Sequence, residues 1–373
     1  AGRGRGGLVL LSGEAGVGKT RLAEELATGA AGPVLRGRAR QAATTAYGPV
    51  VAAFRSLLRE RPNALDGSGP LQAHLALILP ELGDPAPAGD GATLIEAVHA
   101  ALAHVAREVP ALVLLDDLQW SDEATLGLLA TLAEPLARLP VLVVAGYRPD
   151  GLPRDHAARV LRSELRRGGR LQELVLAPLG PDGTTALITQ VLGGAPAPIL
   201  AGTIHERTQG VPFFVEELAR ALRTAGALTS GPGGLELADD TPVPVPDTVR
   251  DAVLMSASEL SGEARAAAAA AAVAGAAFDL DLVAVAASAA GLAELAERGV
   301  IAEDGLGRGA FRHALTRDAF YAEVPWLARR ALHRTMAEAL EATGGREAEV
   351  ATHWLEARDA ARARDALLRA AEA

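Results

Sequence analysis

A single lysine constrains this chain more than any other residue. Lysine and arginine together number 36, and Lys19 is the only lysine among them. It lies in the segment 13–20, which reads Gly-Glu-Ala-Gly-Val-Gly-Lys-Thr and fits the pattern G-x-x-x-x-G-K-[ST]. A loop with this pattern wraps backbone N–H groups around a phosphate and leaves room for a narrow ammonium group, whereas a planar guanidinium is too wide. Because the chain otherwise uses arginine, the retained lysine predicts a phosphate-binding loop.

The neighbours of this loop fit a nucleotide site. Residues 7–11 form a short apolar run, which predicts a buried parallel strand, and residues 21–27 have helical spacing. The N-terminus of that helix then points at the phosphates, where its N–H groups favour negative charge. The Thr20 hydroxyl is suited to ligate magnesium. We therefore expect ATP or ADP with Mg²⁺, bound by Gly13, Glu14, Ala15, Gly16, Val17, Gly18, Lys19, Thr20 and Arg21.

Composition narrows the class of protein. The chain has no cysteine, which excludes disulfides, thiolate metal sites and cysteine nucleophiles. Its net charge of −10 argues against a large nucleic-acid-binding surface. The longest apolar run, residues 266–278, is too short and too rich in alanine to span a bilayer and predicts a buried helix. With no signal peptide visible, we expect a cytoplasmic protein without membrane contact, and a first residue other than methionine indicates a fragment or a processed chain.

Residues 1–180 alternate apolar strands with helical segments. This alternation predicts an α/β phosphate-loop NTPase core with a parallel sheet in the middle of three layers. The strand that ends at Asp116 is expected directly beside the first strand, as in phosphate-loop ATPases. The further strands are expected at 33–38, 111–117, 140–148 and 171–176, and the helices at 47–61, 71–79, 93–109 and 122–139.

The remaining residues predict further domains, as the length of 373 residues suggests. Segment 181–228 is helical and is expected to form a lid, and 229–246 is rich in glycine and proline and is expected to be a linker. Segment 247–324 combines helices with an Asp-Gly pair between apolar residues, which favours a β-hairpin and hence a winged-helix domain. Residues 325–373 are helical and fit the start of a helical-repeat array.

Two acids end one of the expected strands. Asp116 and Asp117 follow a continuous apolar run. In phosphate-loop ATPases one carboxylate at such a place holds magnesium, and the next orients or activates the attacking water. The same pair is also compatible with the start of a solvated loop, but Lys19 and Thr20 favour the metal site. We expect Asp116 to join Thr20 as a Mg²⁺ ligand and Asp117 to act on water.

Two further residues are candidates on weaker grounds. Arg148 ends another buried strand, where an arginine can contact the γ-phosphate across the top of the sheet, although a solvated arginine fits equally. His313 follows the expected hairpin, and a lone histidine is usually structural or exposed. The expected catalytic residues are Lys19, Asp117 and Arg148.

Several motifs resemble those of one class of ATPases. The run 112–120, L-V-L-L-D-D-L-Q-W, is followed by Ser-Asp and resembles the second nucleotide motif of STAND-class ATPases, the signal-transduction ATPases with numerous domains. Within that class the chain most resembles the AAA-type ATPase core of large LuxR-type transcriptional regulators. Tyr147-Arg148 resembles the sensor arginine of this family, and segment 209–214 resembles its G-x-P motif.

The resemblance implies roles for residues in the second half of the chain. It implies that Pro212 packs near the adenine. Segment 245–250 resembles the start of the family's winged-helix domain, and segment 311–321 resembles its end. In related STAND proteins a histidine in this region contacts the ADP phosphate and locks the resting state, which implies this role for His313. The family's Gly-Arg-Glu element is not found before the first strand, and its long repeat region and C-terminal helix-turn-helix are missing.

The expected function is a nucleotide-operated switch with slow Mg²⁺-dependent ATP hydrolysis. ADP is expected to favour a closed form, in which the winged helix folds onto the nucleotide. ATP together with an unidentified inducer is expected to favour an open form that self-associates.

Two alternatives remain open at this point. One is a DNA-remodelling or origin-binding AAA ATPase, and the other is a regulatory module of an attached cyclase or kinase. Charge bears on the first, because residues 247–325 contain six arginines and twelve carboxylates, which makes a poor surface for phosphate backbones. Direct DNA binding by this chain is therefore not expected.

Overall fold

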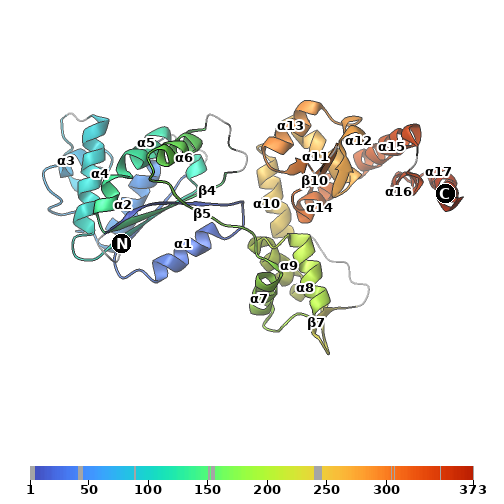
Figure 1. Cartoon of the computed structure of the whole chain (residues 1–373), viewed down its shortest axis with the longest axis horizontal. Coiled ribbons are helices and arrows are strands. Elements are labelled where there is room, and N and C mark those ends of the chain that lie inside the picture. The colour runs from blue at the N-terminus through green and yellow to red at the C-terminus, as the bar shows by residue number, and fades with distance from the viewer. Residues whose placement is uncertain are drawn as a thin grey trace. The chain divides into compact units, whose positions relative to one another are not determined.

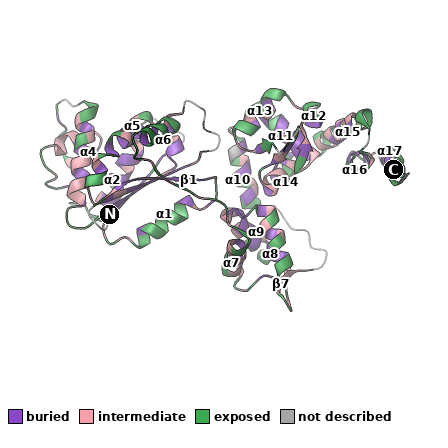
Figure 2. Ribbon diagram, in the orientation of Figure 1, coloured by how far each residue is buried: buried purple, intermediate pink, exposed green. Residues whose placement is uncertain are grey.

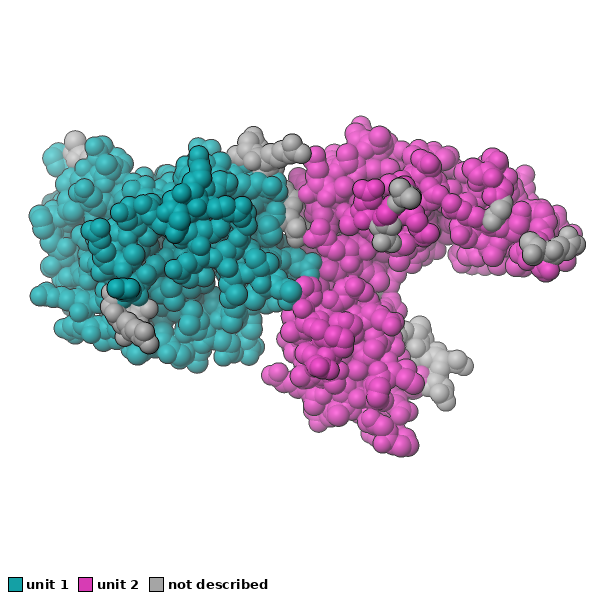
Figure 3. Space-filling model, in the orientation of Figure 1, with its two compact units in different colours: residues 1–177 teal, residues 178–373 magenta. Residues whose placement is uncertain are grey.

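The computed structural model describes residues 5–40, 45–87, 90–149, 152, 156–238, 246–303, 305, 307–344 and 346–372. These residues form two compact units, residues 1–177 and residues 178–373, which Figure 3 shows in two colours. Each unit is described by itself. In the described part of the chain, no helix is long and apolar enough to cross a membrane.

A five-stranded parallel sheet forms the centre of the first unit. The strand order is β2-β3-β4-β1-β5, which confirms the expected α/β phosphate-loop architecture. The expectation that the strand ending at Asp116 lies beside the first strand is wrong, because β4 pairs with both β1 and β3 and separates them. The strands are β1 (Gly7–Ser12), β2 (Val34–Arg38), β3 (Ala111–Asp116), β4 (Val141–Tyr147) and β5 (Gln172–Val175).

Helices cover both faces of this sheet unequally. Helix α1 lies along one face, and α2, α4, α5 and α6 cover the other (Figure 1). Side chains alternate along β1: Leu8 and Leu10 join the larger apolar core, and Leu11 joins the smaller core beside α1. Strands β1, β3 and β4 are largely buried, whereas β5 at the sheet edge and much of α1 are exposed (Figure 2). The helices are α1 (Lys19–Thr28), α2 (Gly48–Glu60), α3 (Gln72–Leu75), α4 (Gly91–Val105), α5 (Glu123–Leu132) and α6 (Ala157–Arg167).

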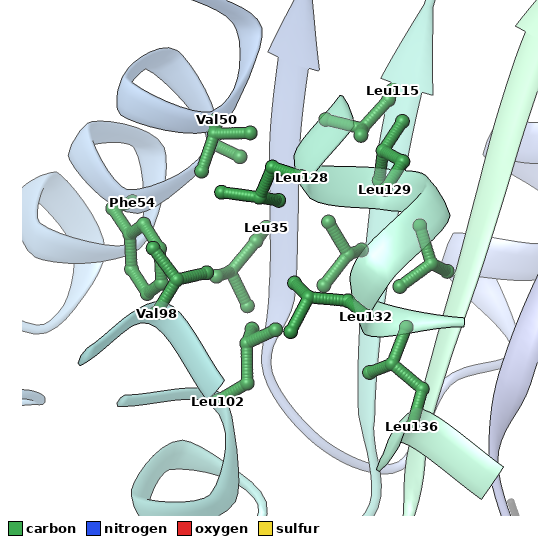
Figure 4. A pocket seen from close by; sticks show the side chains of 13 residues that line it. Leu35, Val50, Phe54, Val98, Leu102, Leu115, Leu128, Leu129, Leu132 and Leu136 are labelled. Atoms are coloured by element: carbon green, nitrogen blue, oxygen red, sulfur yellow. The ribbon is translucent and has the colours of Figure 1, made fainter. Parts of the chain in front are cut away.

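A small apolar cavity lies within the larger core. Its volume is about 20 Å³, and aliphatic and phenyl side chains of β2, β3, β4, α2, α4 and α5 surround it (Figure 4). Leu35, Phe54 and Leu102 are among the side chains that face it. A space of this size without polar lining is a packing void of the core and not a ligand site.

Two expected helices are much shorter in the structure, and each is followed by a proline that begins a separate 3₁₀ turn. The helix expected over 71–79 is limited to α3, and a turn over 76–78 follows it before Pro80, which disfavours helical conformation at Leu79. The helix expected over 122–139 ends with α5 at Leu132, and Pro135 then begins a separate 3₁₀ turn, η3 (Pro135–Arg138). A second 3₁₀ turn, η1 (Pro80–Leu82), follows α3.

The second unit begins with three helices and a β-hairpin. Leucine, isoleucine and valine side chains of the helices form one apolar core with the hairpin. The linker expected over 229–246 is wrong at its start, because β6 and β7 pair there as antiparallel strands; residues 239–245 lie outside the described residues. The elements are α7 (Pro181–Leu192), α8 (Pro198–Thr208), α9 (Pro212–Thr224), β6 (Leu228–Gly231) and β7 (Gly234–Leu237).

A second helical group follows in the same unit. The alanine-rich α11 is buried among its neighbours, as the apolar run predicts. Strands β9 and β10 pair antiparallel, and β8 pairs with the other edge of β10; Asp304, at the expected turn, lies outside the described residues. The elements are α10 (Asp247–Ala257), α11 (Gly262–Ala274), β8 (Ala277–Asp279), α12 (Leu280–Ala284), α13 (Ala289–Glu297), β9 (Ile301–Glu303), β10 (Arg308–Phe311) and α14 (Ala314–Glu323).

Three helices end the described chain. Buried Trp354 and Met336 join them to the core of the preceding group. The helices are α15 (Trp326–Thr343), α16 (Glu347–Glu356) and α17 (Ala360–Glu372).

Candidate nucleotide-binding site

The loop between β1 and α1 has the backbone conformation of a phosphate cradle. Gly16 and Gly18 have φ values of 76° and 102°, in the left-handed region that other residues rarely adopt. Gly13 has little room, since a Cβ atom there would lie 2.9 Å from the carbonyl oxygen of Leu176. Glycine is therefore required both for the turn and for the close approach of β1 to the chain that follows β5.

Lys19 lies inside this loop. Its Nζ donates hydrogen bonds of 2.7 Å to the carbonyl oxygens of Gly13 and Glu14, and the residue is only 7% exposed. The loop thus folds around the ammonium group and holds it at the N-terminus of α1. An anion that binds the loop N–H groups meets this fixed positive charge.

Thr20, in α1 directly after the phosphate loop, meets Asp116, although β1 and β3 are not neighbours in the sheet. The Thr20 hydroxyl donates a 2.7 Å hydrogen bond to Oδ2 of Asp116. Strand β4 lies between β1 and β3, and its Gly146 leaves room for this contact, because a Cβ atom there would lie 2.9 Å from Oδ1 of Asp116. A hydroxyl and a carboxylate that converge in this way are oxygen ligands of the kind that Mg²⁺ prefers. The donor set fits magnesium bound together with nucleotide phosphates.

Asp117 is bound by three side chains. Its Oδ2 accepts a 2.8 Å hydrogen bond from Nε of Arg38 and lies 2.7 Å from Nη2 of the same residue, an ion pair, and its Oδ1 accepts a 2.8 Å bond from Gln119. Nη2 of Arg148 lies 3.8 Å from the same Oδ1. Burial alone raises the pKa of the Asp117 carboxyl, but the hydrogen bonds from Arg38 and Gln119 outweigh burial and hold this pKa below its usual value.

Gln119 connects Asp117 to the end of β4. Its side-chain oxygen accepts a 3.1 Å hydrogen bond from the backbone N–H of Arg148, and its amide nitrogen donates to Asp117. The Arg148 side chain is 40% exposed. Sequence reasoning identified Arg148 and Asp117 and did not identify Arg38, Gln119 or Gly146 as parts of the site. Sequence signals for two of them existed: Gln119 lies within the motif that carries the resemblance, and Arg38 ends an expected strand.

The Ser-Asp pair after this motif has a structural role. Oδ1 of Asp122 accepts hydrogen bonds from the backbone N–H of Thr125, at 2.8 Å, and of Tyr47, at 3.0 Å. It therefore caps α5 and holds the start of α2, where Tyr47 has a φ of 59°.

The other expected binding residues are Arg21 in the first unit and Pro212 and His313 in the second. Arg21 is exposed on α1 and pairs with Glu25 at 2.8 Å. Pro212 opens α9 two residues after Gly210, where a Cβ atom would lie 1.9 Å from the carbonyl oxygen of Leu179. His313 precedes α14, and its ring lies edge-on to Phe214 of α9 at 5.4 Å.

A pocket of about 240 Å³ opens beside the phosphate loop and Asp116 in the first unit. Lys19, Thr20 and Asp116 line one part of it, and Arg36 and Arg38 of β2 line another. Among the described residues, no cluster of three or more histidine, aspartate or glutamate side chains could hold a metal ion without help. A magnesium ion at Thr20 and Asp116 would therefore take its other ligands from phosphate and water.

Comparison with known proteins agrees with a nucleotide site. Residues 1–144 match the family described as AAA ATPase domain. An uncharacterised protein of Rhizobium meliloti (strain 1021) is 29% identical over 251 residues, which are 58% of this chain and 23% of that protein. The chain thus spans about a quarter of the length of the curated relative that it matches.

Several solved structures are also similar. A STAND protein with a tetratricopeptide repeat sensor from Pyrococcus horikoshii aligns with a TM-score of 0.39 and 14% identity, over 95% of this chain and 46% of that chain. Cdc6p from Pyrobaculum aerophilum aligns with a TM-score of 0.39 and 12% identity, over 89% and 88%. A RuvB variant from Thermotoga maritima aligns with a TM-score of 0.38 and 17% identity, over 86% and 88%.

Proposed function

Since the chain carries an AAA-type ATPase domain, we propose that it is the ATP/ADP-dependent switch of a regulatory protein, in particular of a transcriptional regulator of the STAND class. The observation that carries the proposal is the set of hydrogen bonds that the Asp117 carboxylate accepts. The carboxylate expected to act on water is held by Arg38 and Gln119. A site arranged in this way hydrolyses ATP slowly, as a switch requires.

The residues of the first unit supply the binding chemistry. Lys19 and the loop N–H groups bind the β- and γ-phosphates, and Thr20 and Asp116 hold Mg²⁺. The metal ion would neutralise negative charge on the phosphate oxygens. Arg148 follows β4, which pairs with β3, the strand that ends at Asp116. In this proposal Arg148 contacts the γ-phosphate. Asp117 orients the attacking water once Arg38 releases it.

Contacts within the second unit support transmission of the nucleotide state. Arg207 of α8 forms an ion pair with Asp318 of α14, and Phe214 of α9 contacts His313. Val211, at the start of α9, is completely buried in the core of the group that follows. We propose that this group is a winged-helix domain that moves with the lid. In the closed state Pro212 packs near the adenine and His313 binds the ADP phosphate.

The partners follow from the same proposal. The protein works in the cytoplasm, ATP and an inducer release the closed form, and the open form self-associates. The output domain lies elsewhere in the full protein, because this chain is acidic and residues 247–325 offer little positive charge to DNA. The attached domain is a DNA-binding domain in our proposal, and a cyclase or kinase is the alternative.

Two measurements on the whole chain test the proposal. Calorimetric titration with ADP and with a slowly hydrolysed ATP analogue, both with Mg²⁺, measures binding, and single-turnover kinetics measures hydrolysis. We expect tight binding of both nucleotides and hydrolysis far slower than in a motor ATPase. Rapid hydrolysis that duplex DNA stimulates, together with salt-dependent DNA binding, would favour the DNA-remodelling alternative instead.

A further inference from the structure

We propose that Glu173 is a positioning residue for the nucleotide site, which couples the start of the phosphate loop to the strand end that carries Arg148. Glu173 lies in β5, and its side chain is 11% exposed. The hydroxyl of Tyr147 donates a 2.6 Å hydrogen bond to its Oε1. Nε and Nη2 of Arg162, in α6, donate bonds of 2.9 and 2.7 Å to its Oε2. Strand β5 pairs with β1, with Glu173 opposite Leu10 and Val175 opposite Ser12.

The position of this cluster connects it to the nucleotide site. Ser12 is the last residue of β1, directly before Gly13, and Tyr147 is the last residue of β4, directly before Arg148. The two residues are partners in the register between β1 and β4. Because β1 pairs with β4 on one side and with β5 on the other, a shift of the β4 end would strain the buried hydrogen bond from Tyr147 to Glu173 and disturb the pairing at Ser12.

The protonation states keep these bonds strong. Burial alone raises the pKa of Glu173, but the hydrogen bonds from Arg162 and Tyr147 outweigh burial and lower it, so the group remains a carboxylate. Burial and the bond to Glu173 raise the pKa of Tyr147 above its usual value, so its hydroxyl remains a donor. Hydrogen bonds with one ionised partner are shorter and about twice as strong as neutral ones.

Stability alone does not account for a charge at this place. Leu10, Leu161 and Leu165 are buried in the core to which these elements contribute. Replacement of a buried ion pair by apolar side chains is often neutral or stabilising, because desolvation of the charges offsets their attraction. We infer that the network serves to set the positions of Ser12 and Tyr147, and through them Gly13 and Arg148.

The inference rests on the proposed nucleotide-binding function and predicts different effects on two nucleotides. Tyr147→Phe removes the hydroxyl next to Arg148 and is expected to weaken binding of an ATP analogue about three- to tenfold, with less than about twofold change for ADP. Arg162→Lys keeps the positive charge but loses the paired Nε and Nη2 hydrogen bonds to Glu173. It is expected to weaken binding of the ATP analogue more than binding of ADP, as Tyr147→Phe does.

Calorimetric titration of the whole chain with ADP and with the ATP analogue, both with Mg²⁺, is the test. Leu165→Val is the matched control, because it disturbs the packing of α6 without touching the network. It should lower the melting temperature and leave the ratio of the two affinities unchanged. A double-mutant cycle then combines Tyr147→Phe with Arg148→Ala. The Phe substitution should have no further effect on the ATP analogue when Arg148 is absent.

The outcomes separate this inference from the proposed function. If the unmodified chain binds neither nucleotide, the proposed function is wrong. If it binds both, and Tyr147→Phe leaves the affinity ratio unchanged or adds independently to Arg148→Ala, the positioning role of Glu173 is wrong and the proposed function stands.

Discussion

Arg38, the last residue of β2, binds Asp117, the first residue after β3, through a hydrogen bond of 2.8 Å from Nε and an ion pair of 2.7 Å from Nη2. Asp117 is 7% exposed and has a φ of 59°, so its carboxylate is held by backbone conformation as well as by its partner. The carboxylate of Asp117, which is expected to act on water, is therefore paired with the guanidinium of Arg38.

Substitution of Arg38 by alanine is expected to speed hydrolysis of bound ATP by about three- to tenfold, because Asp117 is then free to orient water. Single-turnover kinetics at saturating ATP measures this rate. Arg36→Ala is a matched control, because Arg36 also lines the pocket but pairs with Glu24 and not with Asp117. A slower rate in Arg38→Ala would mean that Arg38 assists catalysis directly.

Asp117→Asn is expected to slow hydrolysis more than it weakens ATP binding. The amide keeps the size of the side chain but cannot serve as a base, whereas Asp116 and Thr20 still hold the metal. The rate and the ATP affinity should be measured on the same variant. A collapse of affinity with an unchanged rate for bound ATP would show that the roles of Asp116 and Asp117 are reversed.

Lys19→Ala is expected to abolish tight nucleotide binding, because no other lysine is available. Ligand at a hundredfold excess over Kd stabilises the folded state by about 2.7 kcal/mol. A thermal-shift titration with ADP and Mg²⁺ should show this stabilisation in the unmodified chain and not in the variant. An equal shift in both proteins would refute the assignment of the loop.

His313→Ala is expected to speed ADP release about ten- to a hundredfold, which corresponds to loss of a hydrogen bond to a charged group of about 1.5–3 kcal/mol. The variant should also self-associate more readily with ATP. Phe214→Leu is the matched control, because it removes the ring contact of 5.4 Å but keeps the imidazole donor. A lower melting temperature with an unchanged ADP release rate would make His313 a structural residue.

The stability of the second unit is expected to depend on His333. This residue is 4% exposed, its Nδ1 lies 2.8 Å from Nδ1 of His353, and Tyr321 hydrogen-bonds to its Nε2. Burial and then the positive charge of its neighbours lower its pKa to about 4. The unfolded chain, with a pKa of about 6.5, takes up the proton first, so stability is lost as the pH falls below about 6.5 toward 4.

The expected loss is about 1.4 kcal/mol in the free energy of unfolding between about pH 7.5 and pH 5.5. Denaturant titrations at the two pH values measure it. His333→Gln should remove most of this dependence. If the dependence persists in the variant, other groups cause it.

The sequence alone determined the parts of the site that are contiguous in the chain. The phosphate loop was readable because Lys19, its glycines and the apolar run before them are local, and a glycine or an ammonium is required there by backbone and phosphate geometry. The strands of the sheet were readable because parallel strands buried on both faces are continuous apolar runs.

Only the tertiary structure decided which strand ends lie together. The insertion of β4 between β1 and β3 depends on hydrogen bonds between distant segments, which no local pattern encodes. Gly146 became a site residue only because Asp116 approaches it, and Arg38 only because β2 pairs with β3 and ends opposite Asp116. The same holds for Glu173, whose side-chain partners come from β4 and α6. Side-chain contacts of this kind are set by the packing of the whole unit, and therefore a sequence pattern names the groups but not their partners.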